Sequence, residues 1–129
     1  MEKEKRRILI VDDDPKMVEL LRDHLDKDYK IDIACDGEEA LAKTINLGSD
    51  RPDLIVLDVI LPKINGHEVA KIIKENESCK SIPIIMLSSM DQPLDKITGL
   101  VNSKADYYLT KPINMSDLLV LILKIFSAS

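Results

Sequence analysis

The feature that most constrains the fold is a set of five short apolar runs, which recur at regular spacing along the chain. Four of the runs are continuous, and continuous runs are typical of strands buried on both faces of a parallel sheet. The run at residues 31–34 alternates instead, which favours a strand nearer the edge of the sheet. The runs occupy residues 8–11, 31–34, 54–61, 82–87 and 106–109.

Segments with helical periodicity lie between these runs. Asp14 is expected to be the N-cap of the first helix, with Pro15 at its first helical position. Further helices are expected over about residues 37–47, from about residue 66, around residues 94–101 and over about residues 114–126. Five alternations of strand and helix predict an α/β fold, with a doubly wound parallel sheet, right-handed crossovers and helices on both faces.

Composition narrows the classes of function. The length of 129 residues suits one domain, so we expect residues 1–129 to form a single unit. The net charge of −5 lacks the basic footprint of a nucleic-acid-binding domain. The apolar stretch at residues 118–123 is far shorter than the roughly 20 residues of a membrane span. Two widely separated cysteines, Cys35 and Cys79, fit a reducing compartment. We therefore expect a cytoplasmic domain without direct contact to membranes or nucleic acid.

Polar residues stand at the ends of the predicted strands, where open α/β sheets bind their ligands. The first strand is followed by Asp12 and Asp13, and by Asp14, which we interpret as a cap. Asp58 is more unusual, because aspartate is depleted in strands and a buried carboxylate is costly unless it is paired or metal-bound. The fourth and fifth runs lead into Ser88 and Lys111.

The combination points to phosphoryl chemistry. If the first and third strands are neighbours, Asp12, Asp13 and Asp58 converge and raise each other's pKa. A magnesium ion removes that penalty, since it prefers oxygen ligands. With a cation from Lys111 and a hydroxyl from Ser88, the group could position a phosphoryl group. A carboxylate can act as the nucleophile and become an acyl phosphate.

Five segments together resemble the receiver domain of response regulators, the phosphoacceptor half of two-component signalling. They cover nearly the whole chain, in order and at the spacing of the family. The resemblance implies a five-stranded flavodoxin-like sheet in the order 2-1-3-4-5. The matching segments are residues 8–15, 36–41, 52–69, 82–89 and 106–112.

The resemblance assigns roles around the carboxylates. Asp58 is implied to be the phosphorylated residue and also one of the residues that bind Mg²⁺. Asp13 is implied to bind Mg²⁺ directly, Asp12 mostly through water, and Ile60 through its backbone carbonyl. Lys111 is implied to contact a phosphate oxygen.

The resemblance also assigns a switch. Ser88 matches the Ser/Thr switch position and Tyr108 the aromatic switch position, with Tyr107 on the opposite face of the strand. The bond before Pro112 is implied to be cis, and X-Pro is the common context for a cis bond.

Some positions depart from the common family pattern without removing a catalytic group. Lys63 and Asn65 replace a frequent Gly and Asp in the loop after the third strand, Lys104 replaces a usual Gly, and Ser89 stands where Ala or Gly is usual. Two positions that tune attack by water in the family, residues 60 and 90, are apolar here, which predicts a long-lived phosphorylated state.

The predicted function is a phosphorylation-controlled signalling switch rather than a metabolic enzyme. A histidine kinase or a phosphotransfer protein would supply the phosphoryl group, and the face of helix four, strand five and helix five would transmit the change. One alternative is an aspartate-based phosphohydrolase with Asp12 as nucleophile and Asp14 as acid, although Pro15 and Lys16 do not suit it. Another is a receiver-like scaffold that works without phosphorylation. Either a stand-alone regulator or a piece of a larger one fits the sequence.

The last predicted helix is apolar in nearly every direction. From residue 118 to residue 126, Lys124 is the only charged residue. A helix that covers one side of a sheet needs a narrower apolar stripe. We therefore expect an outward patch among Leu119, Val120 and Leu123, used for homodimerisation or for docking a partner or an output domain.

Overall fold

Strands and helices alternate in the computed structural model, which describes residues 5–45, 50–89 and 105–128. The helix expected around residues 94–101 and the end of the second helix near residue 47 lie outside these residues. The strands are β1 (Arg7–Val11), β2 (Lys30–Ala34), β3 (Leu54–Asp58), β4 (Ile84–Ser89) and β5 (Tyr107–Lys111). The helices are α1 (Pro15–Leu25), α2 (Gly37–Ile45), α3 (Gly66–Glu75) and α5 (Met115–Ala128).

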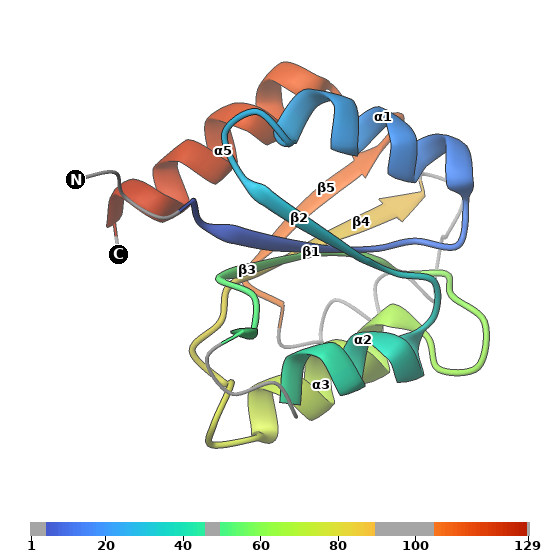
Figure 1. Ribbon diagram of the computed structural model, residues 1–129. Coiled ribbons are helices and arrows are strands. Elements are labelled where there is room, and N and C mark those ends of the chain that lie inside the picture. The colour runs from blue at the N-terminus through green and yellow to red at the C-terminus, as the bar shows by residue number, and fades with distance from the viewer. Residues whose placement is uncertain (1–4, 46–49, 90–104, 129) are drawn as a thin grey trace.

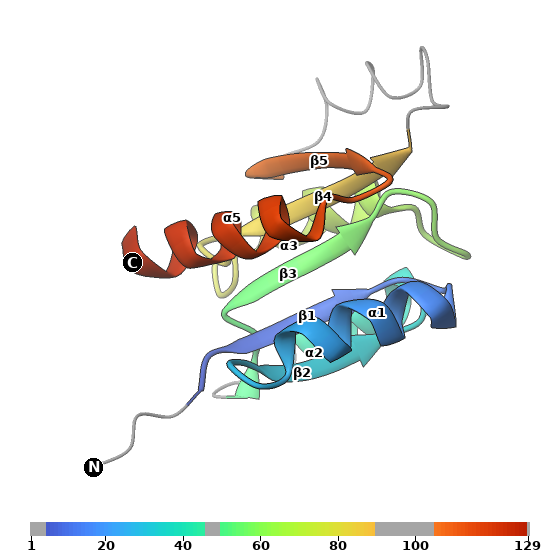
Figure 2. The same cartoon turned by 90° about the horizontal axis from the view of Figure 1, so that it is seen from above.

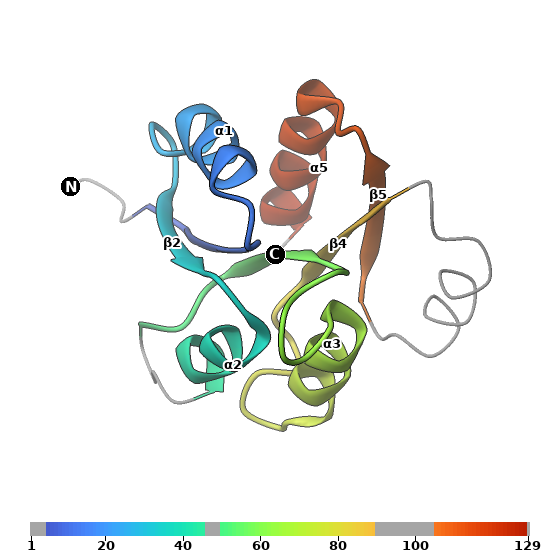
Figure 3. The same cartoon turned by 90° about the vertical axis from the view of Figure 1, so that its right-hand side faces the viewer.

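The five described strands form one parallel sheet in the order β2-β1-β3-β4-β5, which confirms the predicted fold (Figure 2). Helices α1 and α5 cover one face of the sheet, and α2 and α3 cover the other (Figures 1 and 3). Strand β2 lies at an edge, as its alternating pattern predicts. Because parallel strands end on the same side, the residues that follow them meet along one rim.

The sheet separates two apolar cores, and the continuous runs supply both. In β1, Leu9 packs on the side of α2 and α3, whereas Ile8 and Ile10 pack on the side of α1 and α5. All three side chains are buried. The same alternation divides β3, where Ile55 and Leu57 face the first core. A strand with a core on each face cannot alternate with polar residues, which explains the unbroken apolar runs.

Strand β3 is shorter than the predicted run, which continued to residue 61. The strand ends at Asp58, and only Val59 N–H still donates to the neighbouring strand, to Leu87 O at 3.1 Å. The carbonyl of Val59 instead accepts the N–H of Gly66 at 2.7 Å, so the chain has already turned towards α3. Asp58 is therefore the last residue of a strand and not an interruption within one.

The last two strands also begin and end later than expected. Ile82 N–H donates to Cys79 O at 3.1 Å and completes the turn after α3, so β4 begins at Ile84. Strand β5 extends to Lys111. It is partly exposed rather than buried on both faces, because it forms the second edge of the sheet.

Loop chemistry fixes the starts of α1 and α3. Asp14 is the N-cap of α1, and its Oδ1 accepts the N–H of Lys16 at 3.0 Å, in agreement with the sequence interpretation. Asn65 is the N-cap of α3, and its Oδ1 accepts the N–H of Glu68 at 3.0 Å. Lys63 has a φ of 70°, the left-handed region that favours glycine.

Helix α5 has both a buried and an exposed apolar side. Leu118 and Ile122 are fully buried, whereas Val120 is 50% exposed and Leu123 is 59% exposed. The expectation for Leu119 was wrong, because this side chain is partly buried against the core under α1 and α5. Within the described residues, no helix is long and apolar enough to span a bilayer.

Candidate functional site

Three carboxylates meet at the rim formed by the ends of β1 and β3. Val11 and Leu57 are register partners in these adjacent strands, so the residues that follow them come together. Asp12, Asp13 and Asp58 each offer a carboxylate oxygen, and these oxygens lie within 4.8 Å of one another. Asp12 is 2% exposed and Asp58 is 7% exposed, whereas Asp13 is exposed to solvent. The cluster is thus open to solvent on the side of Asp13.

Lys111 supplies the positive charge at this rim. Its Nζ donates a hydrogen bond to Asp58 Oδ2 at 3.0 Å and lies 3.7 Å from Asp12 Oδ2. Burial alone would lower the pKa of Lys111, but the hydrogen bond and charge of Asp58, together with the charges of Asp12 and Asp14, hold its pKa above the usual value. The Lys111–Pro112 peptide bond is cis, as expected.

The two oxygens of Asp58 have different partners. Oδ2 accepts from Lys111, and Oδ1 accepts the backbone N–H of Ile60 at 3.2 Å. The side chain of Ile60 is 61% exposed and turns away from the apolar core. The carboxylate is therefore held at a fixed orientation by one cation and one backbone amide.

The surroundings of Asp12 disfavour the charged form of its carboxylate. Its Oδ1 accepts the N–H of Asp14 at 2.9 Å, but its buried Oδ2 accepts no hydrogen bond from the described residues. Burial, followed by the charges of Asp58 and Asp13, raises the pKa of Asp12 to about 6. Lys111 and the Asp14 amide oppose this rise only in part.

This donor set suits a hard divalent cation. It offers only carboxylate oxygens, one of them buried without a hydrogen bond, and its excess negative charge is relieved by a cation. Mg²⁺ keeps several water ligands, and the exposed side of Asp13 leaves room for them.

Two hydroxyl groups on β4 and β5 have no hydrogen-bond partner among the described residues. Ser88 Oγ and Tyr108 Oη are both buried atoms without a hydrogen bond there. Ser88 is the β4 residue paired with Thr110, one position before Lys111. The ring of Tyr108 packs against the core on the side of α2 and α3, whereas Tyr107 is 38% exposed.

The sequence interpretation did not identify Lys74, which lies near the end of α3. The Lys74 side chain is only 10% exposed, and its Nζ donates to Asp106 Oδ2 at 2.7 Å and to Ile82 O at 2.6 Å. Asp106 Oδ2 also accepts the N–H of Ile84 at 2.8 Å. This clamp ties α3 to the starts of β4 and β5. The spacing of Lys74 four residues after the buried Ala70 was the available signal.

Comparison with known proteins agrees with the geometry. Residues 8–123 match the response regulator receiver domain, and the chain belongs to this family. It is 44% identical over 108 residues to the alkaline phosphatase synthesis transcriptional regulatory protein PhoP of Bacillus subtilis. The matched region covers 83% of this chain but only 42% of PhoP. The chain therefore spans less than half of the length of PhoP.

Solved structures show the same architecture. The signal receiver domain of a histidine kinase from Syntrophus aciditrophicus matches with a TM-score of 0.85 and 31% identity, over 95% of this chain and 91% of that one. The Mn²⁺-bound form of the response regulator Rcp1 matches with a TM-score of 0.75 and 33% identity, over 95% of this chain and 92% of that one. This chain is thus a receiver domain of two-component response regulators.

Proposed function

We propose that this receiver domain is a phosphorylation-activated switch and that Asp58 accepts the phosphoryl group. The observation that carries the proposal is the setting of Asp58: a nearly buried carboxylate at a strand end, held 3.0 Å from the Lys111 ammonium and next to Asp12 and Asp13. A histidine kinase or a histidine phosphotransfer protein is the proposed donor.

The proposed reaction is a transfer between two side chains. A carboxylate oxygen of Asp58 attacks the phosphorus of a donor phosphohistidine, a P–O bond forms and the P–N bond breaks. The imidazole, protonated on its other nitrogen, leaves as the neutral ring. Lys111 neutralises charge on the arriving phosphoryl oxygens, and the Ile60 amide keeps the carboxylate oriented.

Mg²⁺ is the proposed cofactor, and it would supply neutralisation of charge shared by the carboxylates and the phosphoryl oxygens. Asp13 would bind it directly, Asp12 mostly through water and Ile60 through its carbonyl. The Oδ2 of Asp12, which accepts no hydrogen bond from the described residues, supports this assignment, and so does the Mn²⁺-bound form of Rcp1, a protein 33% identical to this chain.

Ser88 and Tyr108 are the proposed switch. Phosphorylated Asp58 offers new acceptor oxygens, so Ser88 Oγ moves towards them and Tyr108 follows. Both hydroxyls are buried without a hydrogen bond from the described residues, which supports a role in which they gain a new hydrogen-bond partner. We propose that β5, α5 and helix four transmit this conformational change to a partner. The residues expected to form helix four lie outside the described residues.

The partner of that face is proposed to be an output domain or a second copy of the chain. Val120 and Leu123 are the exposed apolar residues of α5 that would contact it. PhoP, which this chain matches over 42% of its length, is named a transcriptional regulatory protein, which supports control of transcription as the output. The domain itself is proposed to act in the cytoplasm and not to touch nucleic acid.

The domain is proposed to catalyse its own phosphorylation and dephosphorylation without being a metabolic enzyme. A phosphohydrolase would need Asp14 as a free acid, but its Oδ1 accepts the Lys16 amide as the cap of α1. A phosphorylation-independent scaffold would not need Asp58, Lys111 and Ser88 together. We also propose that the phosphorylated state is long-lived, because the apolar side chain of Ile60 cannot orient a water molecule for hydrolysis. Met90, the second position proposed to affect attack by water, lies outside the described residues.

Phosphorylation with a small acyl phosphate and Mg²⁺, followed by mass spectrometry of peptides, tests the proposal. We expect one phosphoryl group on Asp58 and none in Asp58→Asn. Asp117→Asn, at an exposed position on α5, is the matched control and should react like the wild type. Unchanged phosphorylation of Asp58→Asn, or a phosphoryl group on Asp12, would overturn the assignment.

A further inference from the structure

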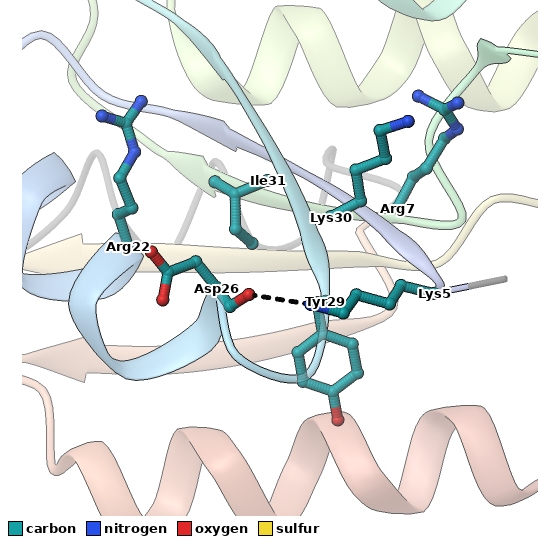
Figure 4. Close-up of a pocket in the computed structure, with 7 residues that line it drawn as sticks. All are labelled: Lys5, Arg7, Arg22, Asp26, Tyr29, Lys30 and Ile31. Atoms are coloured by element: carbon teal, nitrogen blue, oxygen red, sulfur yellow. Dashed lines mark hydrogen bonds between the residues drawn. The ribbon is translucent and has the colours of Figure 1, made fainter.

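A second site lies at the opposite end of the sheet from the carboxylates. A pocket of about 640 Å³ opens beside the edge strand β2 and the end of α1 (Figure 4). Arg7 and Lys30, the first residues of β1 and β2, line it, so it is remote from Asp58 at the other strand ends. Its lining residues are Lys5, Arg7, Arg22, Asp26, Tyr29, Lys30 and Ile31.

The pocket is basic although the chain is acidic. Four of its lining residues are cations and one is an acid, whereas the chain carries a net charge of −5. Within residues 5–45, 50–89 and 105–128, neither Arg22 nor Lys30 has an ion pair. Lys5 Nζ donates a hydrogen bond to the Asp26 carbonyl at 3.4 Å. Local positive charge of this kind attracts anionic partners.

The backbone of β2 gives the pocket a second property. Lys30 N–H donates to Arg6 O at 2.8 Å, and Ala34 O accepts the N–H of Asp12 at 3.1 Å. In a parallel pair alternate residues bond to the neighbour, so Lys30 and Ala34 face β1 while Ile31 and Ile33 face outward. An outward row of amides and carbonyls is a template for another strand.

Side chains close one part of this outward row. Ile33 N–H donates to Asp32 Oδ1 at 2.9 Å, and Ile33 O accepts from Lys43 Nζ at 2.6 Å. Farther along, Cys35 N–H donates to Glu39 Oε1 at 2.8 Å. In the described part of the chain, no side chain bonds to the outward N–H or carbonyl of Ile31 in this way. Ile31 also lines the basic pocket.

An open backbone position among cations fits an extended acidic peptide. The cations lie on both sides of Ile31, with Arg22 on one side and Lys30 and Arg7 on the other (Figure 4). Charges spread in this way match carboxylates along an extended chain better than one compact anion. Main-chain bonds would give affinity and the cations would give specificity.

We propose that this pocket binds a short acidic peptide segment of a partner protein, which pairs with the outward backbone of Ile31 and places its carboxylates on Arg22 and Lys30. The contact is independent of the carboxylate rim, so it adds a docking site to the receiver that does not need phosphorylation.

Binding of a fluorescent hexapeptide of alternating Glu and Val to the full chain tests this proposal. We expect saturable binding that weakens with salt, and shifts of the Ile31 and Tyr29 amide signals in two-dimensional NMR. A peptide with an N-methylated central backbone should bind at least about tenfold more weakly, because it cannot complete the pairing.

Charge reversal tests the cations. Arg22→Glu/Lys30→Glu should lower the affinity at least about tenfold, a change of about 1.4 kcal/mol. Lys71→Glu/Lys124→Glu changes the net charge equally at exposed positions elsewhere and should keep the affinity within about twofold. Thermal unfolding by circular dichroism verifies that both variants fold.

Several outcomes would overturn the proposal. These are the absence of saturable binding, equal losses in both charge-reversal variants, and full affinity of the N-methylated peptide. Displacement of the peptide by inorganic pyrophosphate at an equal concentration would assign the pocket to small anions. Tighter binding of a short DNA duplex would assign it to nucleic acid.

Discussion

The ammonium of Lys111 lies 3.0 Å from Asp58 Oδ2, although two strand crossovers and 53 positions separate the two residues in sequence. Strand β4 stands between their strands in the sheet. Lys111 therefore reaches over the end of β4 and is held by its charge partners. This contact balances two carboxylates at once, because Asp12 Oδ2 is only 3.7 Å from the same nitrogen.

Replacement Lys111→Met should impair both phosphorylation and stability. The change keeps most of the side-chain volume but leaves Asp58 and Asp12 without their cation, so we expect a loss of about 1–2 kcal/mol in the free energy of unfolding at neutral pH. Phosphorylation by a small acyl phosphate should slow at least about tenfold. Urea denaturation and mass spectrometry measure the two effects. Lys71→Met, at an exposed position, is the control and should match the wild type.

The metal-free protein should become more stable as the pH falls through about 6. The folded-state pKa of Asp12 is raised from 3.8 to about 6, so the folded protein binds this proton more tightly than the unfolded chain does. Asp12→Asn should therefore be more stable than the wild type at pH 7, by on the order of 1–3 kcal/mol, and the gap should shrink as Asp12 is protonated towards pH 4. Urea denaturation with a chelator measures the gap. A gap that widens on acidification contradicts the cause assigned here.

Mg²⁺ should reverse the order of those two proteins. A ligand that binds only the folded state at 100 times its Kd stabilises by about 2.7 kcal/mol. The wild type should gain stability with added Mg²⁺ at pH 7, whereas Asp12→Asn and Asp13→Asn should gain much less. Calorimetric melting with and without chelator checks this expectation. Asp117→Asn should respond like the wild type, and an equal gain in all four proteins would rule out a site at the rim.

Lys74→Met should destabilise the chain by about 1–3 kcal/mol, because Asp106 and the Ile82 carbonyl each lose a charge-assisted hydrogen bond. A double-mutant cycle with Asp106→Asn should give a coupling energy of about 1 kcal/mol between the two residues. Denaturation midpoints of the wild type, both single variants and the double variant supply the four values. Additive effects would show that Lys74 acts through packing alone.

The two sides of α5 should respond differently to charge. Val120→Glu/Leu123→Glu should stay within about 0.5 kcal/mol of the wild-type stability, because both positions are half exposed or more. The proposed dimer or docking contact should be lost, which sedimentation of the phosphorylated protein measures. Leu118→Glu, in the core, should prevent folding. If the double variant associates as the wild type does, the α5 patch is not the contact surface.

The rim was predictable because its geometry follows from strand order. Once β1 and β3 are neighbours, the residues after Val11 and Leu57 must meet, and Asp12 and Asp58 stand there. The Lys74 clamp was not predictable in this way. A lysine can bury its stem and still place its charge on a distant partner, and Asp106 follows 32 positions later. The end of β3 was missed for a similar reason, because Val59 is as apolar as the strand and only its bond to Gly66 reveals the turn.

The close approach of Gly66 to Asp58 bears on how such chains can diverge. A Cβ at Gly66 would collide with the Asp58 carbonyl oxygen, and the Gly66 amide already closes the loop onto Val59. The seven residues between Asp58 and Gly66 therefore form a closed loop whose length is fixed. Substitutions within the loop can leave this closure intact, whereas inserted or deleted residues would displace the Asp58 carboxylate from its place at the end of β3. In an alignment of relatives, the count of residues in this loop should vary less than their identity.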